Sequence, residues 1–410
     1  MPVSTTRPVS TTREGNPGDR ARDRPVLLHS LVFLEEGQEV TVGRADVDGY
    51  AVLPAEGAGL LRRLEEGLTP DEAARWYEQT YGERLDIDDF LDGLGELGFL
   101  RDPGEDAHAA PPVRWGRLGR VVFSWAGGGC LASALIACAI VMLRSPELVP
   151  SYHDLFFTHY MTVVELVMIA GQLPLILLHE MAHTLAGRRL GLRTRLSVAR
   201  RLSYIVLVTV MDGLVTVPRR KRYLPMLAGM LADLLVFAVL VLVADVTRQA
   251  GGTLSPAGEI ALGLAYLTLL RLAWQFFLYL QTDLYYVLAT VLGCVDLQGT
   301  ARRVLRDRLA RALRRPASPN RASPHPRDLA VARWYSWLLL AGWTATIAIF
   351  AAAGIPALVY VLLTVGGRLV GSGPHTAAGL ADSVVFVLLN LAQPVLLAAL
   401  VLRERRVLNS

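Results

Sequence analysis

The sequence predicts a mainly α-helical, polytopic membrane protein of about six spans, preceded by a small α+β soluble domain of winged-helix-like architecture. Three observations lead to this fold class. The 410-residue chain is 52% hydrophobic and contains several apolar segments of about 20 residues, the length that crosses a bilayer. An acidic segment with strand and helix signals precedes the first of them. One apolar segment carries the motif HExxH, around which the rest of the chain is organised.

Residues 1–24 are predicted to form a disordered tail. The segment PVSTTR occurs twice in tandem, at Pro2–Arg7 and Pro8–Arg13. A polar stretch rich in Gly, Pro, Asp and Arg follows it, with almost nothing to bury. The tail has no apolar h-region of a signal peptide, so the first spanning helix is expected to direct insertion.

Residues 25–102 are predicted to form a small domain of three strands followed by three short helices. The apolar alternation and turn residues place the strands at Leu27–Phe33, Glu39–Val42 and Asp46–Leu53. The first helix is expected at Ala55–Glu66. Strands followed by short helices favour a winged-helix-like unit.

Two capping signals define the other helices of this domain. Thr69, Pro70 and Glu72 form a capping box with proline at the first helical position, which begins a helix that runs to Tyr81. Asp86 caps a further helix, which continues through Leu97 and ends at Gly98.

Charge is divided unevenly along the chain. Residues 25–102 hold 18 Asp and Glu against 6 Lys and Arg, a net charge of −12, whereas the whole chain has a formal charge of +4. An acidic domain repels phosphate, so nucleic acid is not an expected partner. Three cysteines, Cys130, Cys138 and Cys294, have no CxxC spacing and indicate neither a disulfide framework nor ligands.

The membrane-embedded domain is expected to occupy residues 121–410, after a proline- and arginine-containing linker at 103–120. Ile260–Gly293 exceeds one span and is expected to break or tilt near Gln281, Thr282 and Asp283. A seventh span at Ile355–Val370 is the alternative, but it would place the C-terminal arginines outside. The six favoured spans are Val121–Leu143, Val163–Gly191, Leu224–Val246, Ile260–Gly293, Trp334–Val365 and Ala381–Leu402.

The distribution of arginine predicts the orientation in a cell membrane. Residues 188–222 carry ten basic residues and one acid, and residues 295–328 carry nine arginines and three acids. Residues 145–160, by contrast, contain no Lys or Arg. Basic loops stay in the cytoplasm. The N-terminal domain and the C-terminus are therefore expected to be cytoplasmic.

A β-hairpin is expected within the first basic segment. Tyr204–Met211 and Leu214–Val217 are β-rich and are joined by Asp212 and Gly213, a strong turn signal. An edge strand beside the motif helix can hold an extended peptide by main-chain bonds. A simple connecting loop is the alternative.

The HExxH motif predicts a metal centre. His179 and His183 lie four residues apart, on one face of a helix, so one divalent metal can bridge them. Glu180 follows the first histidine, where its carboxylate can accept a proton from a metal-bound water. Three ionisable residues in one turn of an apolar segment are costly without a partner, which favours a metal over coincidence.

Three acids compete for the third ligand position that a catalytic zinc requires. Asp283 is favoured because it lies in a second apolar segment, among polar neighbours, at a depth that matches the two histidines. Asp233 lies in an apolar helix and could also reach inward. Asp212 stands at the expected turn, where turn chemistry explains it.

These residues together resemble the site-2 protease family of intramembrane zinc metalloproteases. HEMAHTLAGRRLG is similar to the first motif of that family, LAGMLADLLVF to its AGPxxN helix, and QTDLYYVLATVLG lies where its last ligand is found. The resemblance implies one zinc held by His179, His183 and Asp283, Glu180 as the base, and a substrate-positioning place for Asp233. The chain departs from the family at Leu284, Met230 and Asp233, which replace a glycine, a proline and an asparagine.

The N-terminal domain resembles the PqqD-like domains that recognise leader peptides of ribosomally made, modified peptides. The resemblance rests on the order of short strands, on LLRRLEEG, on the Thr-Pro-capped helix and on DDFLDGLGELGFL. The combination of this domain with the HExxH segment is especially similar to the bacterial branch of the protease family, in which such a domain is fused to the protease. A domain that binds nothing and a DNA-binding winged helix are the competing readings.

The leading hypothesis is an intramembrane zinc endopeptidase that cleaves a ribosomal precursor peptide or another membrane-associated peptide. The alternative is a catalytically silent membrane protein that binds a modified peptide or helps to export it. A metal or solute transporter is a third reading, which the lack of an inverted repeat disfavours. The expected partners are thus a peptide substrate and the lipid bilayer.

Overall fold

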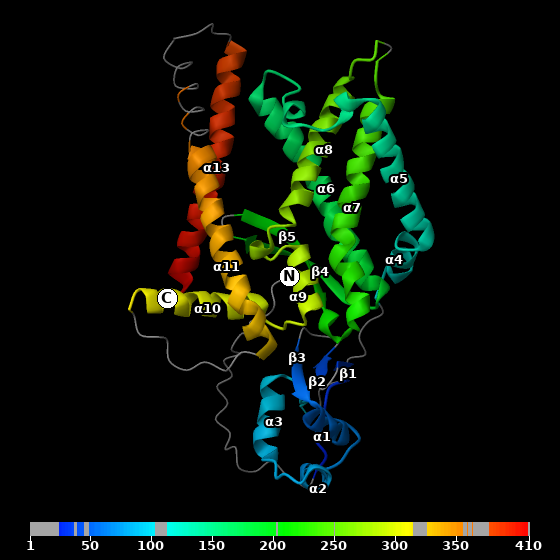
Figure 1. Cartoon of the computed structure of the whole chain (residues 1–410), viewed down its shortest axis with the longest axis vertical. Coiled ribbons are helices and arrows are strands. Elements are labelled where there is room, and N and C mark those ends of the chain that lie inside the picture. Colours follow the sequence, from blue (N-terminus) through cyan, green and yellow to red (C-terminus); the bar gives the residue numbers. More distant parts are fainter. Residues whose placement is uncertain are drawn as a thin grey trace. The chain divides into compact units, whose positions relative to one another are not determined.

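The computed structural model describes residues 24–36, 39–44, 49–102, 113–201, 204–249, 251–314, 326–355, 359, 363 and 377–408. All of the expected tail at 1–24 except Arg24, most of the expected linker and nearly all of Ile355–Val370 lie outside these residues. The described chain is mainly helical, with a small three-stranded sheet near its N-terminus (Figure 1). The predicted helical class with a small α+β unit is confirmed at this level.

The chain divides into two compact units, which are described separately. The first contains the described residues up to 124 together with 183–197 and 208–225. The second contains residues 125–182, 198–207 and the described residues from 226 onward. The division passes through one continuous helix, α6 (Met161–Arg189), between Ala182 and His183.

The sheet of the first unit is an antiparallel meander of β1 (Leu31–Glu36), β2 (Glu39–Arg44) and β3 (Tyr50–Pro54). Phe33 pairs with Val42, and Val42 with Ala51. The expected strands are confirmed, with ends shifted by a few residues. β1 and β3 are the outer strands of this sheet within the described residues.

Three helices complete the N-terminal domain: α1 (Ala55–Glu65), α2 (Pro70–Tyr81) and α3 (Ile87–Glu96). The predicted capping box is present, since the Thr69 hydroxyl accepts from the Glu72 N–H and the Glu72 carboxylate accepts from the Thr69 N–H. Asp86 caps α3 as predicted. A core contributed only by residues 26–100 holds this domain, with Val42, Leu60, Leu61 and Phe99 fully buried at its centre.

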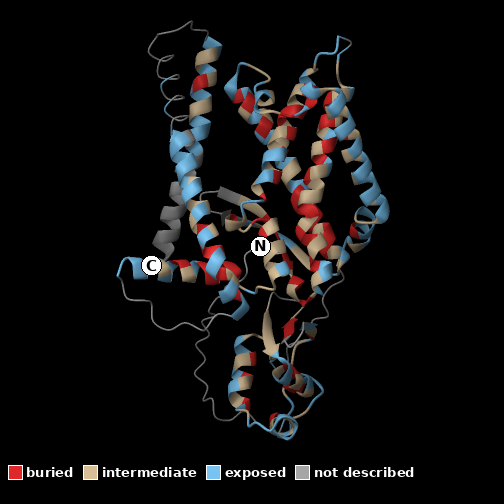
Figure 2. Cartoon of the chain, viewed as in Figure 1, coloured by how far each residue is buried: buried red, intermediate tan, exposed pale blue. Residues whose placement is uncertain are grey.

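Five helices in the described residues are long and apolar enough to cross a membrane. They are α5 (Trp125–Arg144), α6, α7 (Arg219–Val246), α8 (Pro256–Trp274) and α11 (Pro326–Ile349), which continues as a π-helical turn. α13 (Ala377–Leu408) is a further apolar helix. Buried residues are spread along the length of α7, whereas α5 is exposed along most of its length (Figure 2).

The expected break at residues 281–283 is confirmed. α8 ends at Trp274, a 3-10 turn (η4, Leu278–Leu280) follows, Gln281 adopts a left-handed φ of 56°, and α9 (Asp283–Leu292) begins. α9 and α10 (Leu297–Ala312) meet at 88°, and counting this pair as one span gives six candidate spans instead of five.

The first apolar helix begins later than expected. A short helix, α4 (Gly116–Val122), precedes α5, and Phe123 ends it. The guanidinium of Arg189 donates to the Phe123 carbonyl at 2.8 Å. A Cβ atom at Gly119 would overlap the Leu185 carbonyl oxygen, so glycine permits α4 to lie directly on the end of α6.

The hairpin prediction was wrong about the partner strand. β5 (Tyr204–Asp212) pairs with β4 (Arg193–Arg201), which the sequence did not identify, and Leu214–Thr216 is a 3-10 turn, η3. Gly213 ends β5 with a φ of 74°. The N–H groups of Thr216 and Val217 bond to the Gly213 and Leu214 carbonyls within this turn, and Arg222 donates to the carbonyls of Val215 and Val217.

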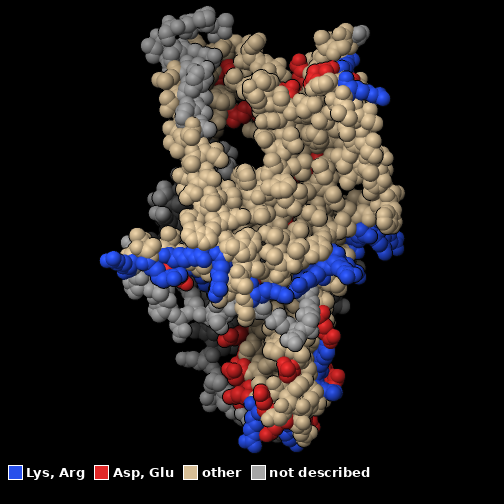
Figure 3. Space-filling model, viewed as in Figure 1, with Lys and Arg blue, Asp and Glu red and all other residues tan. Residues whose placement is uncertain are grey.

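Charge and apolar surface separate along the long helices. In Figure 3 the sides of these helices are almost free of charged residues, and Lys and Arg gather near helix ends and along α10. The described basic groups include Arg188 and Arg189 at the end of α6 and residues 219–222 at the start of α7. Apolar sides with charged ends are typical of helices that lie in a bilayer.

Candidate metal centre

Helix α6 presents the two histidines of the motif on one face. His179 and His183 are one turn apart in a continuous helix, and both are buried, at 6% and 5% exposure. Glu180, between them, is buried as well. Because a single helix fixes the spacing of these residues, their separation does not depend on how the two units are placed.

Asp283 joins this group from the start of α9. Its carboxylate Oδ2 lies 3.3 Å from Nε2 of His179. Two contacts hold the break that positions it: the Thr282 hydroxyl donates to the Gln275 carbonyl, and the Asp283 N–H donates to the Gln275 side-chain oxygen at 3.0 Å. The predicted break in the long apolar segment therefore places the acid beside the histidine.

The potential ligand atoms of His179, His183 and Asp283 lie within 4.8 Å of one another. Among the described residues these three form the group of His, Cys, Asp and Glu that could hold a metal ion. Two imidazoles and one carboxylate are a donor set that zinc accepts, with a fourth position left for water.

Both histidines are oriented by acceptors on their other ring nitrogen. Nδ1 of His183 lies 2.7 Å from the carbonyl oxygen of Pro225 in α7, and Nδ1 of His179 lies 2.9 Å from Oδ2 of Asp233. Carbonyls and carboxylates only accept, so each Nδ1 carries a proton, and Nε2 is the ring nitrogen through which each histidine could bind a metal. This pattern is usual for metal-binding histidines, and the donor set therefore fits a zinc ion.

The two rival acids take other positions. Asp233 is completely buried in α7, bonded to His179 and to Arg271 of α8. Asp212 ends β5 and lies 3.8 Å from the guanidinium of Arg195. Neither belongs to the candidate metal group, whereas Asp283 does.

Arg271 and Gln172 are site neighbours that the sequence did not reveal. Arg271 donates to Asp233 twice and to the Gln172 side-chain oxygen at 2.7 Å. An arginine within an apolar span is a signal that could have pointed to a buried acidic partner.

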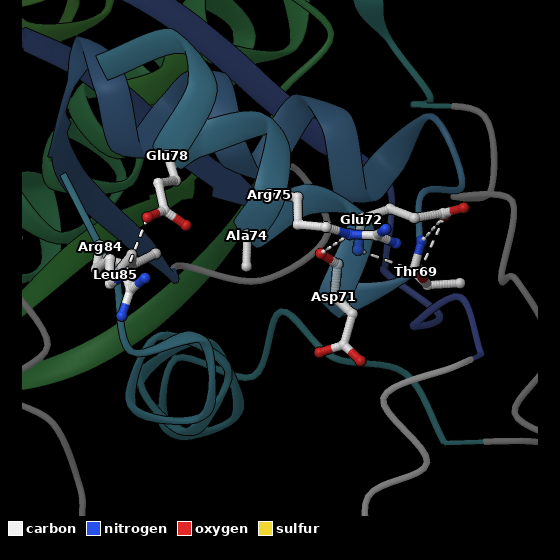
Figure 4. Close-up of a pocket in the computed structure, with 8 residues that line it drawn as sticks. All are labelled: Thr69, Asp71, Glu72, Ala74, Arg75, Glu78, Arg84 and Leu85. Atoms are coloured by element: carbon white, nitrogen blue, oxygen red, sulfur yellow. Dashed lines mark hydrogen bonds and ion pairs between the residues drawn. The ribbon is translucent and has the colours of Figure 1, made fainter. Parts of the chain in front are cut away.

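A hollow on the N-terminal domain has different chemistry. In Figure 4, Arg84 pairs with Glu78, and Arg75 donates to the main-chain carbonyl of Asp71; the ion pair has a length of 2.9 Å. The glutamate of the capping box is satisfied by Thr69. The residues that line this hollow are Thr69, Asp71, Glu72, Ala74, Arg75, Glu78, Arg84 and Leu85.

The three cysteines are free in the structure. Cys138 is buried among α5, α7 and α8, and Cys130 is exposed. The expectation that they form no disulfide framework agrees with this arrangement.

Comparison with protein-family models, with curated proteins and with solved structures found no match for this chain.

Proposed function

We propose that this protein is a membrane-embedded zinc endopeptidase. The observation that carries the proposal is the group of His179, His183 and Asp283, in which both histidines are buried and their Nδ1 atoms donate to Asp233 and to the Pro225 carbonyl. Support also comes from Glu180, which adjoins the first ligand as in HExxH hydrolases.

The chain's own residues have separate tasks in this chemistry. Zinc, when bound, lowers the pKa of a water molecule and polarises the scissile carbonyl. Glu180 accepts the proton of the attacking water and returns it to the leaving amine. The burial of His179 and His183 limits the access of solvent to the group.

The chain is proposed to lie in a cell membrane with its N-terminal domain and C-terminus in the cytoplasm. The five long apolar helices and the basic segments between them support this orientation. The substrate is then a peptide that reaches the membrane, and the outer strand β3 can pair with an extended peptide. Together with the PqqD-like resemblance, this favours a leader-bearing ribosomal precursor.

The test compares new peptide termini in membranes that contain wild type or Glu180→Gln. Wild type should generate termini that Glu180→Gln does not, with a loss of about 100-fold or more in cleavage, the scale of general acid and base groups. Zinc content should be equal in both, because the substitution leaves the ligands intact.

A matched control is available on the same helix. Glu165 lies on α6 and accepts from the Asn390 amide at 3.0 Å, so Glu165→Gln makes the same chemical change away from the group. It should cleave as wild type does. Cleavage that persists in Glu180→Gln would refute the mechanism, and wild-type membranes that yield no new terminus would favour the silent peptide-binding protein.

A further inference from the structure

Asp233 joins three helices, because it lies on α7 and binds one residue of α6 and one of α8. It lies on α7 with an exposure of 0%. The guanidinium of Arg271, on α8, forms a bidentate pair with its carboxylate, with Nε 3.0 Å from Oδ2 and Nη2 2.6 Å from Oδ1. His179 of α6 donates to Oδ2 at 2.9 Å. Both oxygens are thus engaged within the protein, which leaves the acid no direct access to a substrate.

Gln172 fixes the arginine in turn. Its side-chain oxygen accepts from Arg271 Nη1 at 2.7 Å, and its Nε2 donates to the Leu264 carbonyl at 3.2 Å. Gln172 precedes His179 by seven residues, about two helical turns, so the two side chains share a face of α6. α6 and α8 are close here, because a Cβ at Gly171 would lie 2.6 Å from Leu264 Cδ2.

The charges of this network match a divalent metal. A buried carboxylate is costly without a partner, and the bidentate guanidinium supplies one. With a divalent ion in place, the carboxylates of Asp233, Asp283 and Glu180 and the guanidinium of Arg271 leave no net formal charge. The asparagine of the resembling family would leave this arginine without its counter-ion.

We propose that Asp233 is a positioning residue for the metal centre: its carboxylate, locked by Arg271 and Gln172, holds His179 with Nε2 directed to the metal. Asp233 then acts through His179 instead of on the substrate, which replaces the role implied by the family resemblance. The inference rests on the proposed zinc site but not on peptide cleavage.

The test measures metal binding by purified full-length protein. Asp233→Asn should lower the zinc affinity, determined by competition with a chromophoric chelator, by about 10- to 100-fold, the usual effect of losing such a partner. The visible absorption spectrum of the cobalt(II)-substituted protein should also change, because the single amide oxygen of asparagine replaces the two carboxylate oxygens that bind Arg271 and His179, so the ring is held less firmly. Wild-type affinity and an unchanged cobalt spectrum in this variant would overturn the proposal.

Asp328→Asn is the matched control. Asp328 is also a buried acid, at 2% exposure, and accepts from the N–H groups of Val295 and Asp296 at 2.9 Å. Its substitution removes a buried carboxylate that has no hydrogen bond to the candidate ligands in the described structure. In Asp328→Asn the zinc affinity and the cobalt spectrum should be those of wild type. If Asp328→Asn lost as much zinc affinity as Asp233→Asn, Asp233 would contribute only to the stability of the fold, and the proposal would be wrong.

A double variant covers the case in which Asp233→Asn fails to fold. Asp233→Asn with Arg271→Gln removes both charges, so no buried charge is left unpaired. This variant should fold and still bind zinc more weakly than wild type. Wild-type affinity in it would show that Asp233 only neutralises Arg271. A wild-type protein without zinc affinity would instead refute the metal centre, before any variant is compared.

Discussion

Nδ1 of His183 lies 2.7 Å from the carbonyl oxygen of Pro225. A carbonyl cannot donate, so this bond assigns the proton to Nδ1 and leaves Nε2 as the potential ligand atom. The acceptor is a main-chain atom of α7, and side-chain changes on that helix do not remove it. The orientation of the His183 ring is therefore set by a main-chain atom, whereas the acceptor at Nδ1 of His179 is the side chain of Asp233.

The first prediction concerns the two histidines. Purified wild type should contain about one zinc per chain, and His179→Ala or His183→Ala should each lose most of it, because two ligands rarely retain zinc against competing buffers. Metal content by atomic emission measures this directly. Equal zinc content in wild type and in the variant that carries both His179→Ala and His183→Ala would exclude this metal site.

The second prediction concerns the third ligand. Asp283→Asn keeps the size of the side chain but weakens coordination, so zinc should fall to the level of the histidine variants. Asp212→Asn is the matched control, since Asp212 lies beside Arg195 and outside the candidate group. Zinc retained in Asp283→Asn but lost in Asp212→Asn would transfer the ligand role to the strand end.

The third prediction concerns the contact between α4 and α6. Gly119→Ala should destabilise the protein by about 1–3 kcal/mol, because the added methyl overlaps the Leu185 carbonyl oxygen. Gly129→Ala, in α5, meets nothing within 4 Å and should be neutral or slightly stabilising. Thermal melts of the two variants measure the difference, and equal midpoints would contradict the close approach of α4.

The fourth prediction concerns the capping box of the N-terminal domain. A fragment of residues 25–102 should fold alone, since its core draws only on residues 26–100. Thr69→Ala should lower its free energy of unfolding by about 1 kcal/mol. Thr80→Ala, in the same helix, removes only a hydroxyl that donates back to the Trp76 carbonyl and should cost less. Urea titrations compare the variants.

The capping box also predicts a pH dependence. Hydrogen bonds from the Thr69 N–H and hydroxyl lower the pKa of Glu72 below its usual value. A carboxyl with a lowered folded-state pKa stabilises above its unfolded pKa and loses this contribution as pH falls through the folded one. The difference between wild type and Thr69→Ala should therefore shrink in acid, and a constant difference would argue against the ionised box.

The fifth prediction concerns orientation. A reporter fused between residues 315 and 325 should be cytoplasmic, because the nine arginines of residues 295–328 oppose translocation. One inserted between Leu148 and His153 should be external. Reversed labelling would overturn the proposed orientation and the face at which cleavage occurs.

Local signals in the sequence were sufficient for several elements. The spacing of His179 and His183 follows from helix periodicity, and both residues lie on α6 as expected. Thr69 and Glu72 form the predicted box, and the polar triplet at 281–283 marks the break that precedes α9. Each of these depends on contacts within one or two turns, which the chain encodes without reference to distant segments.

Other features depended on distant partners. Asp283, Asp233 and Asp212 all remained candidates for the third ligand, and only the packing of α7, α8 and α9 distinguished them. The hairpin was misplaced because Arg222, outside the expected strands, binds the carbonyls of Val215 and Val217. By itself the sequence determined which helix carries the two histidines and the glutamate of the motif. Only the tertiary structure decided that Asp283 of α9 faces Nε2 of His179 and that Asp233 of α7 binds Nδ1. The physical reason is distance along the chain: Asp233 lies 54 positions from His179 and 38 from Arg271, so only the packing of helices brings these residues together.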